Sequence, residues 1–170
     1  MKYRILYGCA VFALTLSTTS AQTKSAITGK CDKPDVLQTL PAGDVDGHNF
    51  SIAHLKCSST GEINGVASKN AVAAEHTDST ANRARSWGVY VQTLEDGDKV
   101  FYDYQTNLSF KSDGTASGSN KYQITGGTGK MKGIKGVGTC KLTSAADGGT
   151  DYSCEGEYTL AAAAPAKRKN

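Results

Sequence analysis

The chain has 170 residues, with 19 lysines and arginines against 16 aspartates and glutamates. Removing Lys2 and Arg4 with a predicted leader of 21 residues leaves 17 basic against 16 acidic side chains, a net charge of +1. This balance excludes nucleic-acid binding driven by bulk charge, and the remaining 149 residues suffice for one domain.

Residues 1–21 have the pattern of a secretory signal peptide. Two positive charges precede a twelve-residue apolar run from Ile5 to Leu16, and small residues follow as far as Ala21. The run is too short to span a membrane, which takes about 20 apolar residues. A lipoprotein site at Cys9 fits less well, because most of the apolar run follows this cysteine. We therefore expect a secreted or periplasmic protein without stable membrane insertion.

Residues 22–46 are expected to form an N-terminal arm. They contain Pro34 and Pro41 and show little hydrophobic periodicity. The domain itself is expected to span residues 47–160. Its first predicted strands lie at residues 48–57 and 62–74, and a third begins at Arg85.

The segment Glu95-Asp96-Gly97-Asp98 predicts a hairpin with a two-residue turn. In an antiparallel pair the numbers of facing residues add up to a constant, which for this turn is 193. The predicted facing pairs on the buried side are Val91–Tyr102 and Val89–Tyr104. Tyr90 then lies on the opposite side of the sheet.

A similar tight turn at Asp113-Gly114 does not fit the residues around it. It would place Leu108 opposite Ser119 and leave Tyr122 on the face that does not hold the other apolar side chains. A bulge or a longer loop is therefore expected at this position.

Alternation of apolar and polar residues predicts an all-β fold. Leucine, isoleucine, valine and phenylalanine make up 23 of the 149 residues after the leader, a share that would indicate disorder if the net charge were high. Because the charge is balanced and no helical period stands out, about seven or eight short antiparallel strands are expected. Such strands form a barrel or a sandwich, and the many glycines favour strongly curved strands and a closed barrel.

The glycine-rich segment from Ile124 to Gly136 predicts a compact turn between two strands. It does not fit a phosphate-binding loop, because Lys130 is followed by Met131 and Lys132 stands where a dinucleotide fingerprint needs glycine. The predicted turn residues are Gly126, Gly127, Gly129, Gly133 and Gly136.

Four cysteines follow the leader, and this even number predicts two disulfides in an exported chain. A turn centred on Asp147, midway between two alternating stretches, places Cys140 opposite Cys154. Cys31 then pairs with Cys57 by elimination. Thiolate-bound metal is not expected, because no Cys-x-x-Cys spacing occurs. The side chains predicted to share a face with the Cys140–Cys154 pair are Leu142, Tyr152, Tyr158 and Leu160.

The segment Gly126-Gly-Thr-Gly-Lys-Met131, with Gly133, Gly136 and a closing strand after Tyr152, resembles the allene oxide cyclase barrel-like family and, more distantly, the plant dirigent proteins. The resemblance covers the chain from Phe50 to Leu160. It implies an eight-stranded antiparallel barrel of the calycin type with an apolar lumen, often oligomeric in the plant members. For the characterised plant enzymes it implies a barrel that steers a reactive fatty-acid epoxide or phenoxy radical without metal or nucleotide.

Four aromatic residues form the candidate ligand pocket: Trp87, Tyr102, Tyr104 and Tyr122. Such side chains fill the interior of a small barrel, or they line its mouth and orient an apolar ligand through hydroxyl and indole N–H groups.

The histidines and paired carboxylates are expected at the surface. His48 and His54 are six residues apart, about 20 Å along a strand, so they cannot hold one metal ion together with His76. Glu155 and Glu157 point to the face opposite the predicted apolar one, where solvent exposure is expected rather than acid–base chemistry.

These features predict an exported, disulfide-stabilised barrel that binds a small hydrophobic ligand without catalysis, metal or cofactor. One alternative is a non-metal cyclase or isomerase of the allene oxide cyclase type, acting on a reactive lipid-like or phenolic substrate. Another is a structural or interaction module with a filled barrel. A lumen would separate the first two from the third, and a buried carboxylate or tyrosine pair with perturbed titration would favour the enzyme. The family resemblance allows for a homo-oligomer. No nucleic-acid partner is expected, and residues 161–170 are expected to form a flexible basic tail.

Overall fold

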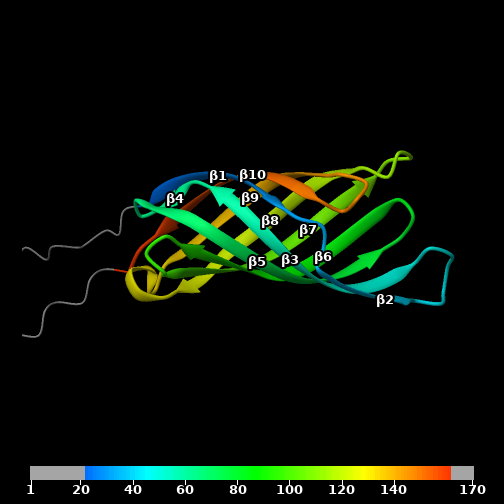
Figure 1. The fold of residues 1–170 in the computed structure, drawn as a ribbon, viewed down its shortest axis with the longest axis horizontal. Coiled ribbons are helices and arrows are strands. Elements are labelled where there is room, and N and C mark those ends of the chain that lie inside the picture. Colours follow the sequence, from blue (N-terminus) through cyan, green and yellow to red (C-terminus); the bar gives the residue numbers. More distant parts are fainter. Residues whose placement is uncertain (1–21, 162–170) are drawn as a thin grey trace, which may run out of the picture.

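The computed structural model describes residues 22–161, so the predicted signal peptide and almost all of the predicted basic tail lie outside the described residues. The described chain consists of strands and one short 3-10 helix (Figure 1). None of these residues forms a helix long and apolar enough to cross a membrane. The elements are β1 (Thr23–Cys31), β2 (Val36–Pro41), β3 (Asn49–Thr60), β4 (Glu62–Ile63), β5 (Val66–Ser79), β6 (Arg83–Leu94), β7 (Lys99–Phe110), β8 (Ala116–Gly127), η1 (Gly129–Met131), β9 (Lys135–Ser144) and β10 (Thr150–Thr159).

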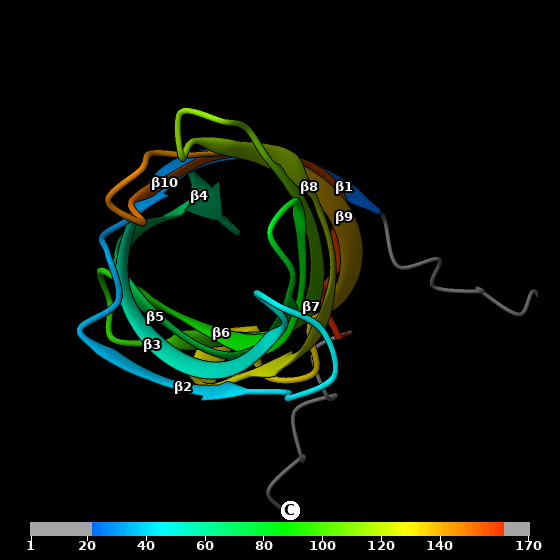
Figure 2. The ribbon, with the colours of Figure 1, turned by 90° about the vertical axis from the view of Figure 1, so that its right-hand side faces the viewer.

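Eight of the strands close into an antiparallel barrel, which confirms the predicted fold class. Their order is β3-β1-β10-β9-β8-β7-β6-β5, and pairing between β5 and β3 completes the ring. Figure 2 shows the ring along the barrel axis. The other two strands are short additions: β2 follows β1 along the same edge of β3, and β4 pairs with the start of β5.

Residues 22–46 are not an arm outside the barrel, because β1 forms part of the wall between β10 and β3. Alternate residues of β1 are the less exposed ones, as in any wall strand. Three of these positions hold Ser25, Gly29 and Cys31, which are polar or small. The strand therefore alternates in exposure without the hydrophobic periodicity that would have revealed it.

Three hairpins of the barrel share one turn, in which an Asp-Gly pair ends a three-residue loop at residues 95–97, 112–114 and 146–148. The glycine of each loop has a φ of +82° to +91°. The aspartate side chain accepts a hydrogen bond of 2.9 to 3.1 Å from the backbone N–H two residues later. The shared geometry is a turn followed by a left-handed glycine, the common form of a three-residue hairpin loop.

This loop length shows that the register predicted for the first hairpin was wrong by one residue. Tyr90 pairs with Tyr102, so facing numbers add up to 192, and Val89 lies on the exposed outer face. A two-residue type I′ turn needs positive φ at both central residues, whereas here only Gly97 adopts it. The longer loop expected at Asp113-Gly114 is confirmed.

Both predicted disulfides are confirmed, and each joins directly facing residues of neighbouring strands. Cys140 pairs with Cys154 across β9 and β10, with the register predicted from a turn centred on Asp147. Cys31 pairs with Cys57 across β1 and β3.

The strand predicted at residues 62–74 is divided by a tight turn at Asn64-Gly65. Asn64 has a φ of +53° and Gly65 a φ of +73°, the pair of left-handed residues that a type I′ turn requires. The turn folds β4 back onto β5, with Ile63 facing Val66.

A hydrophobic plug fills the end of the barrel that lies at the left of Figure 1, where β4 is labelled. Its members are Ile63, Leu94, Val100, Tyr102, Ile124, Met131, Ile134 and Tyr158. Met131 comes from η1, so the glycine-rich segment forms the expected compact turn between β8 and β9 and also supplies part of the plug.

The predicted turn glycines have two different roles. Gly129 and Gly133 have positive φ values and make the turn itself. Gly126 and Gly127 belong to β8, and Gly136 belongs to β9. A Cβ at Gly136 would come within 2.9 Å of both Ile124 and Tyr158, so this glycine lets the plug pack closely against the wall.

Candidate functional site

The barrel contains a central cavity of about 150 Å³, and all eight barrel strands contribute side chains to its lining. The lining includes three of the four disulfide cysteines, Cys31, Cys140 and Cys154, and several aliphatic side chains. Its tyrosines are Tyr90, Tyr102, Tyr104, Tyr122 and Tyr152. Its other polar residues are Ser59, Glu75, Ser86, Gln92, Thr106, Asn120 and Thr150. Because Tyr102 belongs both to this lining and to the plug, the cavity lies next to the closed end of the barrel.

Glycines directly opposite the tyrosines keep the central cavity open. The facing pairs are Gly29–Tyr152, Gly88–Tyr104 and Gly138–Tyr122. In each pair, a Cβ on the glycine would overlap the tyrosine ring. Each ring therefore lies against the bare backbone of the neighbouring strand, an arrangement known to protect glycines in sheets. A larger residue at any of these glycines would push the ring toward the lumen.

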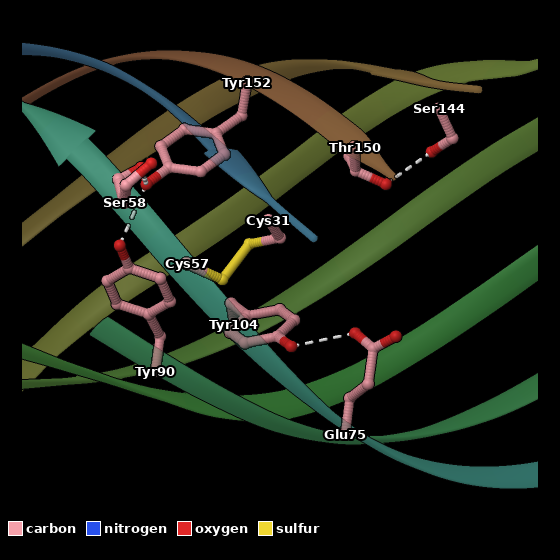
Figure 3. Close-up of a disulfide and its surroundings, with 9 residues drawn as sticks. All are labelled: Cys31, Cys57, Ser58, Glu75, Tyr90, Tyr104, Ser144, Thr150 and Tyr152. Carbon is pink, nitrogen blue, oxygen red and sulfur yellow. Dashed lines mark hydrogen bonds between the residues drawn. A yellow bond between two sulfur atoms is a disulfide. The ribbon is translucent and has the colours of Figure 1, made fainter. Parts of the chain in front are cut away.

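The tyrosine hydroxyls form short hydrogen bonds inside the barrel. The hydroxyls of Tyr90 and Tyr152 are 2.9 Å apart, and Tyr152 donates to the carbonyl oxygen of Ser58 at 3.1 Å (Figure 3). Tyr102 donates to Oε1 of Gln92 at 2.6 Å. Burial raises the pKa of the Tyr90 and Tyr102 phenols far above the usual value, so both stay neutral at any physiological pH.

Glu75 is the carboxylate of the cavity. The hydroxyl of Tyr104 donates to Oε2 of Glu75 at 2.8 Å, as Figure 3 shows. Burial raises the pKa of the Glu75 carboxyl, and the hydrogen bond from Tyr104 opposes this rise. Burial, followed by the charge of Glu75, also raises the pKa of Tyr104. The pair is thus an acid held in a mainly apolar space, with a proton that is removed less easily than in water.

Two buried amide atoms of the cavity lining have no hydrogen-bond partner among residues 22–161. They are Nε2 of Gln92, a donor, and Oδ1 of Asn120, an acceptor. The other amide atom of Asn120 donates to Thr106 at 3.0 Å. An unpaired buried polar atom costs about 1–3 kcal/mol, so these two side chains are suited to recognising a polar group of a bound molecule.

The structure brings three of the four predicted pocket residues together. Tyr102, Tyr104 and Tyr122 line the central cavity. Trp87 does not line it and instead stacks against His76, with ring centroids 5.3 Å apart. Odd-numbered residues of β6 face outward and even-numbered ones face inward, so Trp87 cannot share a face with the tyrosines.

Sequence reasoning missed Tyr90, Glu75 and Tyr152, as well as the amide side chains of Gln92 and Asn120. Tyr90 was assigned to the outer face because the predicted register was shifted by one residue. Glu75 follows the end of the strand predicted at residues 62–74. Tyr152 was detectable, since the correct register of its hairpin already placed it on the face of Cys154.

The histidines lie outside the cavity lining, as their predicted surface position requires. His48 lies between two carboxylates, with Nδ1 2.6 Å from Asp44 and Nε2 3.0 Å from Asp78. The hydrogen bond with Asp44 is the main cause that raises the pKa of His48. Nδ1 of His54 lies within hydrogen-bond distance of Oδ1 of Asp35, at 2.7 Å. In the described part of the chain, no three histidine, cysteine or carboxylate side chains gather as a metal site would require.

Replacing Glu75 by glutamine should raise the stability of the barrel at neutral pH. A raised carboxyl pKa means that Glu75 favours folding below about pH 4, where it is protonated in both states, and that this contribution is lost as pH rises through the folded-state pKa. Glutamine cannot ionise and still accepts the hydrogen bond from Tyr104.

We therefore expect the melting temperature of Glu75→Gln to exceed that of the wild type by about 2–4 °C at pH 7.5, which corresponds to about 1 kcal/mol. The difference should vanish at pH 4. Scanning calorimetry at both pH values measures it, with the exposed Glu155→Gln on β10 as the control. An equal effect of Glu75→Gln at both pH values would contradict the role of ionisation.

No protein-family model matches the chain, and no curated protein matches it by sequence. Among solved structures, the pterocarpan synthase dirigent protein PsPTS1 superimposes with a TM-score of 0.51 and 14% sequence identity, covering 84% of this chain and 97% of that chain. This chain shares the barrel fold of dirigent proteins. The pterocarpan synthase dirigent protein GePTS1 gives a TM-score of 0.49 and 12% identity over 89% of this chain and 99% of its own.

A pyocyanin demethylase gives a TM-score of 0.38 at 15% identity, covering 78% of this chain and 99% of that chain. At such low identities, likeness concerns the fold, and the activity of this chain has to be argued from its own residues.

Proposed function

We propose that the protein binds a small, mainly apolar molecule with one polar end inside the barrel. The observation that carries this proposal is the central cavity with its unpaired donor on Gln92 and unpaired acceptor on Asn120. A barrel that served only as a structural module would gain stability by filling this space with larger side chains, since buried voids and unpaired polar atoms both destabilise a fold.

The size of the cavity limits the ligand. Its volume of about 150 Å³ equals that of an engineered apolar cavity that accepts benzene. A single six-membered ring or a compact branched group is therefore the expected part of the ligand that enters. The tyrosine rings and the disulfides form the apolar wall, and the hydroxyl, amide and carboxyl groups supply the polar contacts.

Filling the central cavity should abolish binding without unfolding the barrel. Ala73 is buried and lines the cavity, whereas its neighbour Ala74 is exposed on the outer face of β5. We expect Ala73→Leu to weaken the binding of p-cresol, a single ring with one hydroxyl, by at least about tenfold, and Ala74→Leu to change it by less than about twofold. A titration with p-cresol, followed by the NMR chemical shifts of the tyrosine rings, measures the affinity of each variant.

The alternative outcomes decide the proposal. Native mass spectrometry of protein from its natural source should also show a bound small molecule. Equal p-cresol binding by Ala73→Leu and wild type would place the binding site elsewhere, and an empty protein that binds no p-cresol would leave the barrel a structural module.

The second candidate function is a non-metal isomerase or cyclase, and the Glu75–Tyr104 pair favours it. A carboxyl group with a raised pKa, shielded inside an apolar cavity, is the kind of group that enzymes use for proton transfer. If this function holds, purified wild-type protein should carry the bound product, and purified Glu75→Gln should carry the bound substrate. Because isomerisation leaves the mass unchanged, the two compounds would have the same mass and differ in chromatographic retention. Recovery of one identical compound from both proteins would argue against catalysis.

We also propose that the protein works outside the cytosol. Two disulfides between facing strand residues support this location, because such bonds persist in oxidising compartments.

A further inference from the structure

The tyrosine rings of the central cavity surround one space from several directions. Tyr90 meets Tyr102 edge to face with centroids 5.6 Å apart, and Tyr102 meets Tyr122 in the same way at 5.7 Å. Tyr90 and Tyr152 are also perpendicular, at 6.5 Å. Rings set at right angles in this way direct electron-rich faces, as well as edges, toward the shared space.

One carboxylate accompanies these rings, and the cavity supplies no positive charge to balance it. Among the described residues that line the cavity there is no lysine, arginine or histidine, and Glu75 is the one carboxyl group. Its facing residues on the neighbouring strands are Ala53 on β3 and Gly88 on β6, neither of which ionises. Oε2 accepts a hydrogen bond from Tyr104, and no described residue donates to Oε1. A charged Glu75 therefore lacks a cationic partner within the cavity, and His76, which lies outside the lining, acts on it only through its charge.

A set of aromatic faces with one carboxylate is the arrangement that recognises alkylated ammonium groups. Ring faces attract a cation, more strongly when water is excluded, and the carboxylate provides the opposite charge. A quaternary ammonium group carries no N–H donor and so needs no hydrogen bond, and tyrosines that already bond to one another can still contact it. A volume of about 150 Å³ is enough for a trimethylammonium group with a short chain.

We propose that the ligand of the central cavity is a small organic ammonium cation, with Glu75 as its counter-charge and the tyrosine rings as its cage. This inference rests on the proposed binding function and specifies the chemical class of the ligand. It assigns the cationic end to the region of Glu75, Tyr104 and Tyr90, and the remainder of the molecule to the amide side chains of Gln92 and Asn120.

The proposal couples binding to the ionisation of Glu75. In the empty barrel, burial raises the pKa of this carboxyl, and the groups that act on it are Tyr104 from β7 and His76 next to it on β5. A bound cation favours the charged form, so binding should release a proton when Glu75 is protonated beforehand. The affinity for a cation should therefore increase as pH rises through the pKa of Glu75, while the affinity for a neutral ligand should not increase.

Choline and 3,3-dimethylbutan-1-ol test the proposal, since they have the same shape and differ in the charge of one atom. We expect the full-length wild type to bind choline at least about tenfold more tightly than the neutral alcohol at pH 8, a difference of about 1.4 kcal/mol. Glu75→Gln should remove this preference and leave binding of the alcohol within about twofold. Glu155→Gln, on the exposed side of β10, should behave as the wild type. Isothermal titration calorimetry in two buffers of different ionisation enthalpy measures affinity and proton release together.

The outcomes separate this inference from the proposed function. Equal binding of choline and the alcohol, or an unchanged preference in Glu75→Gln, would overturn the ammonium assignment while leaving ligand binding intact. Absence of binding by both probes and by p-cresol would overturn the binding function itself. Circular dichroism and intact disulfides verify the fold of Glu75→Gln, and the rise of choline affinity with pH in the wild type is a second test that needs no variant.

Discussion

Removing the Cys31–Cys57 disulfide by substitution of both cysteines with alanine should lower the free energy of unfolding by about 3–4 kcal/mol and open one seam of the barrel. β1 and β3 are held together by only four facing residue pairs, from Thr28–Thr60 to Cys31–Cys57. The disulfide lies at one end of this short ladder and closes a sequence separation of 26 residues. Its loss leaves β1 attached to β3 by few hydrogen bonds, while β3 stays paired with β5 and β2.

The matched control is the Cys140→Ala, Cys154→Ala variant. That disulfide lies within a ladder of ten facing pairs between β9 and β10. Its removal should lower the free energy of unfolding by about 3 kcal/mol, because the unfolded chain gains conformational freedom. The β9–β10 hydrogen bonds should persist in the folded state. Urea denaturation measures the stabilities, and hydrogen exchange followed by mass spectrometry measures local opening.

We expect faster exchange at residues 28–31 and 57–60 in the first variant, and no local change near residues 140 and 154 in the second. Uniform exchange in both variants would show that the β1–β3 seam does not depend on its disulfide.

Replacing Gly138 by alanine should destabilise the barrel by about 1–3 kcal/mol, the usual cost of overpacking. A Cβ at this position would overlap the ring of Tyr122, which lies against the glycine on the facing strand. The ring must then turn into the central cavity or the two strands must separate. The cavity should shrink, and p-cresol binding should weaken in parallel with stability.

A double-mutant cycle shows whether the ring is the cause. Tyr122→Ala alone loses apolar contacts, but it also removes the clash with the ring. The close approach of the new Cβ to the carbonyl oxygen of Glu155, at 2.5 Å, remains, so adding Gly138→Ala to Tyr122→Ala should cost less than in the wild-type background but not nothing. We expect a coupling energy of about 1 kcal/mol or more from urea denaturation, and Val137→Ala on the exposed outer face should show none. Strictly additive effects would mean that strain against the backbone, and not the tyrosine, limits the site.

The disulfides were predictable because residues at equal sequence distances from the centre of a hairpin turn face each other across the two strands. The turn centred on Asp147 specified the partner of Cys140, and elimination then paired the other two cysteines. The same reasoning failed at Asp96-Gly97, because the dipeptide occurs in both two-residue and three-residue loops. One extra loop residue moved Tyr90 from the predicted outer face to the lumen and excluded Trp87 from the pocket.

Other parts of the fold and of the candidate site could not be predicted from the sequence pattern. β1 presents small and polar residues to the interior, so its place in the wall follows from pairing with β10 and β3 and not from its hydrophobicity. Glu75 stands where an apolar run ending at Ala74 meets the polar residues that begin at His76, so the local sequence does not say which side it faces, and its burial depends on the closure of the ring. Met131 enters the plug because η1 folds over the end of the barrel.

The sequence by itself determined the all-β class, the positions of the three Asp-Gly turns and both disulfides, since each depends on short-range alternation and on residues with restricted backbone preferences. Only the tertiary structure decided which tyrosines share a cavity with Glu75, which glycines make room for their rings, and that the interior remains partly open. These properties depend on strands distant in sequence meeting in one register around a closed ring, and a shift of a single residue reverses inside and outside.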